Sequence, residues 1–274
     1  MILQETYHLL ETRYRKYLDN VSIEKVQAGI FLTAVQLSTG YCGVASTDLD
    51  STVNCSSRQN RDFGDFTPGN IKGQNVTRLF QFPGDSRILD SVKLAALNAV
   101  SAGIILQSDY QIIEDRDPFD LLNLDGQKRI CIVGAFQDYI KKLAGSGHQL
   151  HVLELNKDAL TEEQQQYYVP AADAPAVIPV ADIIILTGST LVNNTLDNLL
   201  TLIPAGKQAV VVGPSSSLIP DILFKYNVSI IGATKITDPD RMFAIVAEGG
   251  LGYHLFHYCA KKICLINNLP PSER

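Results

Sequence analysis

Cysteine is scarce in this sequence, and the cysteines that are present follow no recognisable spacing. The five thiols form no CxxC pair and no zinc-finger pattern, and they stand at Cys42, Cys55, Cys131, Cys259 and Cys264. An odd number of cysteines does not suit a disulfide framework, so reduced thiols fit better. This observation favours a cytoplasmic protein.

A concentrated basic patch and a long apolar run are also missing. The 274 residues include 23 lysines and arginines against 29 aspartates and glutamates, a net charge of −6, and the basic residues are dispersed. Apolar stretches such as 177–186 are too short to span a bilayer, and residues 1–17 are amphipathic rather than signal-like. We therefore expect neither nucleic acid nor a membrane as a partner, whereas a homo-oligomer stays open.

The usual catalytic signatures are absent as well. The sequence has no HExxH, EF-hand loop, Walker loop or GxSxG elbow, and no Cys/His pair in a nucleophile pattern. His254 and His257 would share one face of a helix, but packing or capping that helix explains them more simply than metal binding, which needs further ligands. No catalytic residue is thus identified, and whether the protein is an enzyme stays open.

What the sequence does contain is a change of pattern near residue 115. Before it, periodic apolar residues predict two helices and the two strands of a β-hairpin, at 2–18, 86–101, 25–37 and 41–46 respectively. Gly103 is the expected stop of the second helix, and the polar stretch 47–75 predicts a long surface loop. We therefore expect a smaller α+β domain over residues 1–115.

Residues 116–274 show short apolar runs that alternate with helical segments. The candidate strands are 129–133, 149–155, 182–186, 209–212, 228–231 and 263–266. The candidate helices are 138–144, 196–202, 217–226 and 239–247, the last with Asp238 as its N-cap and Pro239 at its first position. Uninterrupted valine and isoleucine are typical of strands buried on both faces of a parallel sheet, so this part is predicted to be a doubly wound, Rossmann-like α/β domain.

Ligands bind to such a fold where the strands end, so the residues after each strand are the candidates for a site. The first strand runs into Gly134, Ala135 and Phe136, and Glu154 lies twenty positions beyond Gly134, where an acidic group commonly holds a ribose. The turn lacks the remaining glycines of a GxGxxG motif. Nucleoside binding and plain strand ends are therefore both open interpretations.

Two later strands each end in glycine and hydroxyl groups. One is followed by Thr187, Gly188, Ser189, Thr190 and, slightly further on, Asn193, and the next by Gly213, Pro214, Ser215 and Ser216. Free N–H groups, helix dipoles and hydroxyl donors that face one crevice suit a carboxylate or phosphate. Helix caps and turn formers are the simpler alternative for either loop alone, but two neighbouring loops together favour a small-ligand site.

These motifs carry a family resemblance over nearly the whole chain. It rests on Gly134-Ala135-Phe136, Leu153-Glu154, Ala181-Asp182, the run 186–196, Gly213-Pro214-Ser215-Ser216 and Glu248-Gly249-Gly250, with Gly40 to Ala45 and Leu97-Asn98-Ala99 in the first part. The combination resembles an uncharacterised bacterial and archaeal family labelled "putative heavy-metal chelation". The resemblance implies an enolase-N-terminal-like domain followed by a Rossmann-like domain. The turn at Ala135-Phe136-Gln137 departs from the family, which tends to have an aromatic residue followed by proline there.

The resemblance also implies a ligand site in the cleft between the domains, built by the 187–194 and 213–216 loops and Glu154. Glu154, Asp182 and Asn193 could offer hard oxygen ligands, but no thiolate cluster of the kind that selects heavy metals is present. A transition metal would be held by Glu154 or would arrive inside a bound chelating molecule. We therefore expect a protein that binds a small anionic or metal-chelating ligand. The alternatives are a nucleoside- or S-adenosylmethionine-using transferase or lyase, and an assembly module without a ligand.

Overall fold

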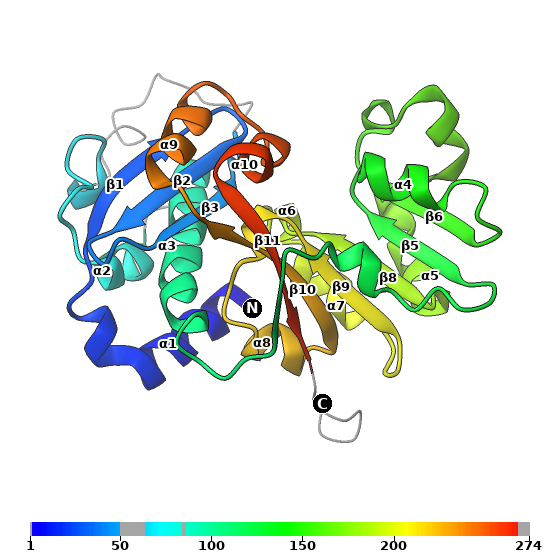
Figure 1. Ribbon diagram of the computed structural model, residues 1–274, viewed down its shortest axis with the longest axis horizontal. Coiled ribbons are helices and arrows are strands. Elements are labelled where there is room, and N and C mark those ends of the chain that lie inside the picture. The colour runs from blue at the N-terminus through cyan, green and yellow to red at the C-terminus, as the bar shows by residue number, and fades with distance from the viewer. Residues whose placement is uncertain (1, 50–63, 84–85, 268–274) are drawn as a thin grey trace.

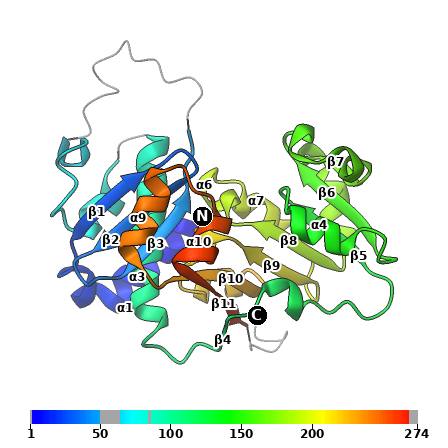
Figure 2. The same cartoon turned by 45° about the horizontal axis from the view of Figure 1, so that its top comes forward.

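A computed structural model describes residues 2–49, 64–83 and 86–267, which fold around two β-sheets (Figure 1). The smaller sheet has the strand order β1-β2-β3, and the larger one has the order β4-β11-β10-β9-β8-β5-β6-β7. In Figures 1 and 2 the smaller sheet lies at one end of the molecule and strands β5 to β7 lie at the other. Half of the loop predicted at 47–75, residues 50–63, lies outside the described residues.

The smaller sheet is an antiparallel meander of β1 (Ile23–Ala28), β2 (Leu32–Leu37) and β3 (Cys42–Ser46). The prediction of one strand over 25–37 was wrong, because the chain turns at Gly29. A Cβ atom at Gly29 would lie 2.3 Å from the carbonyl oxygen of Val246, so another helix packs directly on this turn. The alternation of side chains continues through the turn and hid it from the sequence pattern.

Helices cover both faces of the smaller sheet. Helix α3 (Arg87–Ile105) crosses one face, and α9 (Pro239–Ala247) and α10 (Gly252–Tyr258) cover the other. Helix α1 (Ile2–Leu18) has the predicted bounds, and α2 (Val76–Gln81) lies between α1 and α3. Elements from both ends of the chain therefore enclose this sheet.

Helix α3 corrects two expectations. Gly103 does not end the helix but lies inside it, where a Cβ atom would come within 2.8 Å of the Tyr41 ring. With 19 residues, α3 is also long and apolar enough to cross a membrane by length and composition, although 78% of its most apolar window is buried inside the protein. The buried side chains of α3 belong to the larger apolar core, so α3 is a core helix of this structure.

The larger sheet contains every strand predicted after residue 115. The bounds are β5 (Arg129–Val133), β6 (Gln149–Glu154), β8 (Ile183–Thr187), β9 (Gln208–Val212), β10 (Val228–Ile236) and β11 (Ala260–Ile266). Strands β10, β9, β8, β5 and β6 are parallel to one another, as expected, whereas β11 pairs antiparallel with β10. Two short edge strands, β4 (Ile112–Glu114) and β7 (Tyr168–Pro170), were not predicted because three residues show no period.

Helices pack on both faces of the larger sheet, which makes it doubly wound. Ile130 and Ile132 of β5 point to α4 (Gln137–Leu143), whereas Cys131 between them faces the opposite core. That opposite face is covered by α5 (Ala174–Val177), α7 (Leu196–Thr201) and α8 (Asp221–Lys225), and α6 (Ser189–Val192) follows β8. Helix α8 is shorter than the predicted 217–226.

Short 3₁₀ helices complete the chain. Two of them matter for the site, η3 (Pro118–Leu121) and η8 (Pro214–Ser216). The others are η2 (Gly64–Phe66), η4 (Lys157–Ala159), η5 (Glu162–Tyr167), η6 (Ala171–Asp173) and η7 (Ile178–Val180).

The two sheets share their packing. One apolar core runs from α1 and α3 to α7 and α8, and a second joins Leu32 and Val44 of the smaller sheet to Met242, Phe243 and Leu255. Strand β4 precedes the predicted domain boundary at residue 115 but pairs with β11 beyond it. The division into 1–115 and 116–274 stays a prediction, and both β4 and α9 pack across it.

Candidate functional site

An open groove of about 860 Å³ lies between α4 and α10 at the C-terminal edge of the parallel strands. Figures 1 and 2 show these two helices on either side of the strand ends. Gly213 and Pro214 after β9, Gly232 of β10 and Pro118 of η3 line it between the helices. This is the edge at which doubly wound folds bind ligands.

A carboxylate anchors a lysine in this groove. The Lys262 ammonium lies 2.5 Å from Oδ2 of Asp117, and the Tyr139 hydroxyl donates a hydrogen bond to Oδ1 of the same carboxylate. The backbone N–H of Phe119 also donates to Oδ1, at 2.9 Å. Asp117 is 18% exposed and Lys262 is 43% exposed, so the ammonium is held in place while part of it still faces solvent.

We call Asp117, Tyr139 and Lys262 the anchored trio. The surroundings of Asp117 and Tyr139 fix the charge state of each. Burial raises the pKa of the Asp117 carboxyl, but the hydrogen bonds from Lys262 and Tyr139 outweigh burial and leave this pKa below its usual value. Burial, together with the hydrogen bond to Asp117, raises the pKa of Tyr139 far above its usual value. Asp117 is therefore an anion and Tyr139 a neutral donor across the physiological range.

The two helical walls of the groove differ in chemistry. Helix α4 contributes the exposed Lys141 and Lys142, and the Lys142 ammonium lies 4.6 Å from the centre of the Phe119 ring. Helix α10 contributes Tyr253, which is 72% exposed, and His257, whose ring stacks on that of Tyr253 at 6.0 Å and 10°. One wall is thus cationic and the other largely aromatic.

Three of the predicted site residues line this groove: Phe136, Gly213 and Pro214. Phe136 immediately precedes α4, and its ring stacks on Tyr139 with centroids 5.4 Å apart. Gly134 has a φ of +102°, and a Cβ atom there would lie 3.0 Å from the Thr187 side chain. The loop after β5 therefore touches the end of β8, a contact that the sequence did not predict, and glycine is needed where they meet.

The predicted serines join the two sheets instead of lining the groove. The Ser46 hydroxyl at the end of β3 lies 3.0 Å from the Ser189 hydroxyl and 3.1 Å from the Ser215 hydroxyl. Ser215 is 1% exposed and also accepts a hydrogen bond from the Ser46 backbone at 2.8 Å. Asn98 of α3 completes this seam by donating from Nδ2 to the carbonyl oxygens of Val44 and Ser215.

The remaining predicted hydroxyls form hydrogen bonds inside the protein, and Gly188 packs beside them. The buried Ser216 donates to the carbonyl oxygens of Gly213 and Gly232 at 2.7 and 2.8 Å, and the buried Thr190 donates to that of Thr187 at 2.5 Å. A Cβ atom at Gly188 would lie 3.0 Å from the Ser216 nitrogen. These bonds pack the loops after β8 and β9 against each other.

The side chains of Glu154 and Asn193 form hydrogen bonds within their own turns. One carboxylate oxygen of Glu154 accepts from the backbone N–H groups of Leu155 and Asn156, at 2.7 and 3.3 Å. The Asn193 amide oxygen accepts from the Thr195 hydroxyl at 2.7 Å. Both residues form turns of their own chain, and neither is among the residues that line the groove.

The described residues do not fit a heavy-metal centre of their own. Within residues 2–49, 64–83 and 86–267, no group of three or more His, Cys, Asp or Glu side chains is placed to hold a metal ion. Four free cysteines are buried there, at Cys42, Cys131, Cys259 and Cys264. Burial raises the pKa of Cys42 and Cys131 to about 12, so they are thiols rather than the thiolates that bind soft metals.

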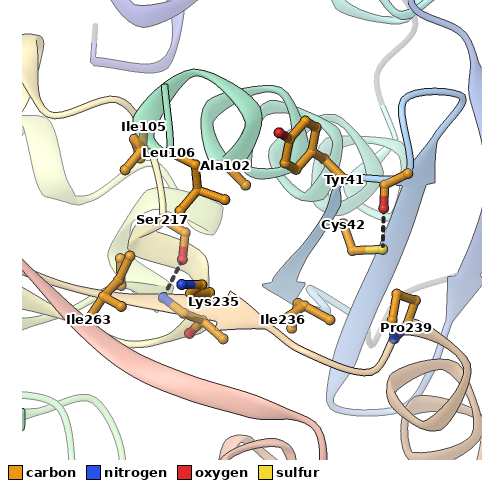
Figure 3. A pocket seen from close by; sticks show the side chains of 13 residues that line it. Tyr41, Cys42, Ala102, Ile105, Leu106, Ser217, Lys235, Ile236, Pro239 and Ile263 are labelled. Atoms are coloured by element: carbon orange, nitrogen blue, oxygen red, sulfur yellow. Dashed lines mark hydrogen bonds between the residues drawn. The ribbon is translucent and has the colours of Figure 1, made fainter. Parts of the chain in front are cut away.

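A smaller pocket of about 120 Å³ lies between the sheets (Figure 3). It is bordered by Tyr41 and Cys42 of the smaller sheet and by Ser217, whose hydroxyl accepts from the Thr234 backbone at 3.0 Å. The Thr234 hydroxyl is buried and has no hydrogen-bond partner among the residues that the structure describes. The pocket is mainly apolar and belongs to the seam.

Two family models match the chain, one over residues 12–101 and the other over residues 117–265, and both are described as "putative heavy-metal chelation". The second model alone covers more than half of the 274 residues. The chain belongs to this family. The resemblance noted in the sequence is therefore confirmed, for the first part of the chain as well as for the second.

One curated relative and two solved structures of family proteins resemble this chain. An uncharacterised protein of Methanocaldococcus jannaschii is 28% identical over 184 residues, which cover 63% of this chain and 66% of that protein. A crystal structure of a family protein of unknown function from Pyrococcus horikoshii matches with a TM-score of 0.77 at 20% identity, covering 97% of this chain and all of that one. One from Desulfitobacterium hafniense matches with a TM-score of 0.68 at 19% identity, covering 93% and 98%. These likenesses confirm the mixed α/β fold.

The anchored trio of the groove was missed by the sequence patterns. Asp117 follows the change of pattern near residue 115 and Tyr139 lies in a predicted helix. Lys262 lies just before the predicted strand 263–266. The one available signal was Lys261-Lys262 at the start of β11, because a lysine in a central strand needs a partner. His254 caps its helix, which was the simpler interpretation of the sequence. Its Nδ1 accepts a hydrogen bond from the Leu251 N–H at 3.0 Å near the start of α10.

Proposed function

We propose that the groove between α4 and α10 binds a small anionic ligand, including an organic chelator that carries a metal ion. The observation that carries the proposal is the Lys262 ammonium, held by Asp117 and Tyr139 beside the strand ends. An ammonium fixed in advance loses little entropy when an acid group binds to it. Partial exposure leaves it able to accept a second anionic partner.

The charge around the groove supports an anion. Lys141, Lys142 and Lys262 line it together with only two acidic residues, Asp117 and Asp138. The whole chain carries a net charge of −6, so this local excess of positive charge is opposite in sign to the molecule. A local excess of one sign of charge, here three lysines against two carboxylates, attracts ligands of the other sign.

The family description points to metals, and the proposal places the metal ligands on the bound molecule. Asp117 already accepts hydrogen bonds from Lys262 and Tyr139, and Glu154 accepts them from its own turn. No group of three or more metal-binding side chains assembles in the described ranges. A polycarboxylate would coordinate the metal through some of its own oxygens, and its remaining negative charge would pair with the lysines of the groove.

Citrate binding tests this function. We expect citrate and Ni²⁺-citrate to raise the melting temperature of the metal-stripped protein, whereas Ni²⁺ alone should not. At a hundred times Kd the ligand should add about 2.7 kcal/mol to the free energy of unfolding. The variant Lys141→Gln/Lys142→Gln should bind citrate more weakly. Lys16→Gln/Lys157→Gln removes two exposed lysines that do not line the groove and should behave as the unmodified protein.

Two results would contradict the proposal. One is a protein that citrate and inorganic phosphate fail to stabilise at millimolar concentration. The other is equal weakening of citrate binding in the groove variant and in the control variant, because that would reflect overall charge and not the groove.

A further inference from the structure

Two aromatic side chains in the wall of the groove are exposed and lie outside the apolar cores. Tyr253 on α10 is 72% exposed, and the exposed His257 one turn later stacks parallel to it. Phe256, on the same helix, packs on the core with one part, also lines the groove, and has its ring centre 5.4 Å from the Lys262 ammonium. Aromatic surface that is kept at the wall of a groove, and not packed into the core, is a common feature of ligand sites.

The anchored charge and the aromatic wall lie close to each other. Lys262 touches Phe256 of α10 and at the same time pairs with Asp117 next to η3. Lys141 and Lys142 lie on α4, which forms the other side of the groove. With a volume of about 860 Å³, the groove falls within the range of small-molecule sites, roughly 300–1,000 Å³.

We infer that the ligand is a planar aromatic ring that bears an acid group. The ring stacks on the Tyr253 and His257 wall, and the acid group pairs with Lys262 and the lysines of α4. This inference rests on the proposed function, and it narrows the ligand from any small anion to one class. Nucleotides and aromatic carboxylates share this chemistry.

Matched pairs of probes separate the ring from the acid. Pyridine-2,6-dicarboxylate and iminodiacetate each carry two carboxylates around one nitrogen, with and without a ring. Adenosine 5′-monophosphate and ribose 5-phosphate form the second pair, and citrate reports anion binding by itself. We expect the ring member of at least one pair to bind about five-fold or more tightly than its partner, the effect typical of one stacked base.

Substitutions at one exposed position test where the ring lies. Tyr253→Ala should remove the preference for the ring member and leave the affinity for iminodiacetate, ribose 5-phosphate and citrate unchanged. Tyr253→Phe keeps the ring and should keep the preference. Tyr258→Ala is the matched control, because Tyr258 is 45% exposed on the same helix and does not line the groove. Isothermal titration calorimetry measures all of these affinities.

The outcomes distinguish this inference from the function it rests on. Citrate binding without a ring preference in either pair, or a preference that survives Tyr253→Ala, overturns the inference and leaves anion binding intact. Failure of citrate and of all four probes overturns both. A preference confined to adenosine 5′-monophosphate identifies a nucleotide, and one confined to the pyridine compound identifies an aromatic carboxylate.

Discussion

The groove between α4 and α10 and the seam between the two sheets use polar side chains in opposite ways. In the seam, Asn98 and Ser215 are buried and bonded to groups of the protein itself. In the groove, Lys141, Lys142 and Tyr253 are exposed around one anchored ammonium. Hydroxyls and glycines after a strand can therefore hold two sheets together. The proposed ligand groove lies at the same edge of the larger sheet, a few residues away. Four variants test this contrast.

Gly43→Ala should cause the largest loss, because it separates the smaller sheet from α3. The added Cβ would lie 2.2 Å from the Ala95 carbonyl oxygen and 2.3 Å from the Ala99 nitrogen, which are backbone atoms of a helix and cannot move alone. We expect a loss of roughly 3 kcal/mol in the free energy of unfolding, measured by urea denaturation.

Gly206→Ala is the control for Gly43→Ala. Gly206 has a φ of +82° and no atom within 4 Å of an added Cβ, so only backbone strain applies and the loss should be about 1 kcal/mol. Equal losses at the two positions would show that the contact between β3 and α3 is not tight.

Asn98→Ala should weaken the seam without touching the groove. The change leaves the buried carbonyl oxygens of Val44 and Ser215 without the donor they share, at a cost of about 2 kcal/mol in the free energy of unfolding. The affinity for citrate should stay unchanged. The exposed Asn193→Ala should cost less than about 0.5 kcal/mol, and a seam variant that loses citrate binding would contradict the separation of the two regions.

Asp117→Asn should give a loss of stability that depends on pH. The folded-state pKa of Asp117 lies below the usual pKa of an aspartate, so its contribution to stability is present above that usual pKa and is lost as the pH falls through the folded-state pKa. We expect a loss of about 1 kcal/mol at pH 7, kept small because Lys262 is half-exposed, and a narrowing difference in acid.

Urea denaturation of both proteins between pH 7 and pH 3 measures this dependence. Asp138→Asn, on the exposed start of α4, is the matched control. A difference between the unmodified protein and Asp117→Asn that stays constant over this range would show that the carboxylate charge is not what the trio requires.

Lys141→Gln/Lys142→Gln should have the smallest effect on stability and a clear effect on binding. Both side chains are exposed, so the free energy of unfolding should change by less than about 0.5 kcal/mol. Citrate affinity should fall about ten-fold, equivalent to about 1.4 kcal/mol. A large loss of stability with unchanged affinity would place these lysines in the fold and not in the site.

The doubly wound sheet could be predicted because burial on both faces leaves uninterrupted apolar runs. Strands β5, β6, β8 and β9 lie within one residue of their predicted bounds. Helix α9 begins at Pro239 after the Asp238 cap, as local capping chemistry requires. The smaller sheet and the helix on it were harder to predict. The alternation of apolar residues continued through the turn at Gly29, and Gly103 lies at a close packing contact inside α3 and not at a helix end.

The amino-acid sequence by itself determined the family and the alternation of strands and helices in the second part of the chain. Those features follow from the period and chemistry of neighbouring residues. The tertiary structure alone decided which polar groups are buried in the seam and which face the groove. Asp117, Tyr139 and Lys262 come from a loop, a helix and a strand, and Asp117 and Lys262 are 145 positions apart. No local pattern reports such a meeting, because it depends on how α4, η3 and β11 pack in three dimensions.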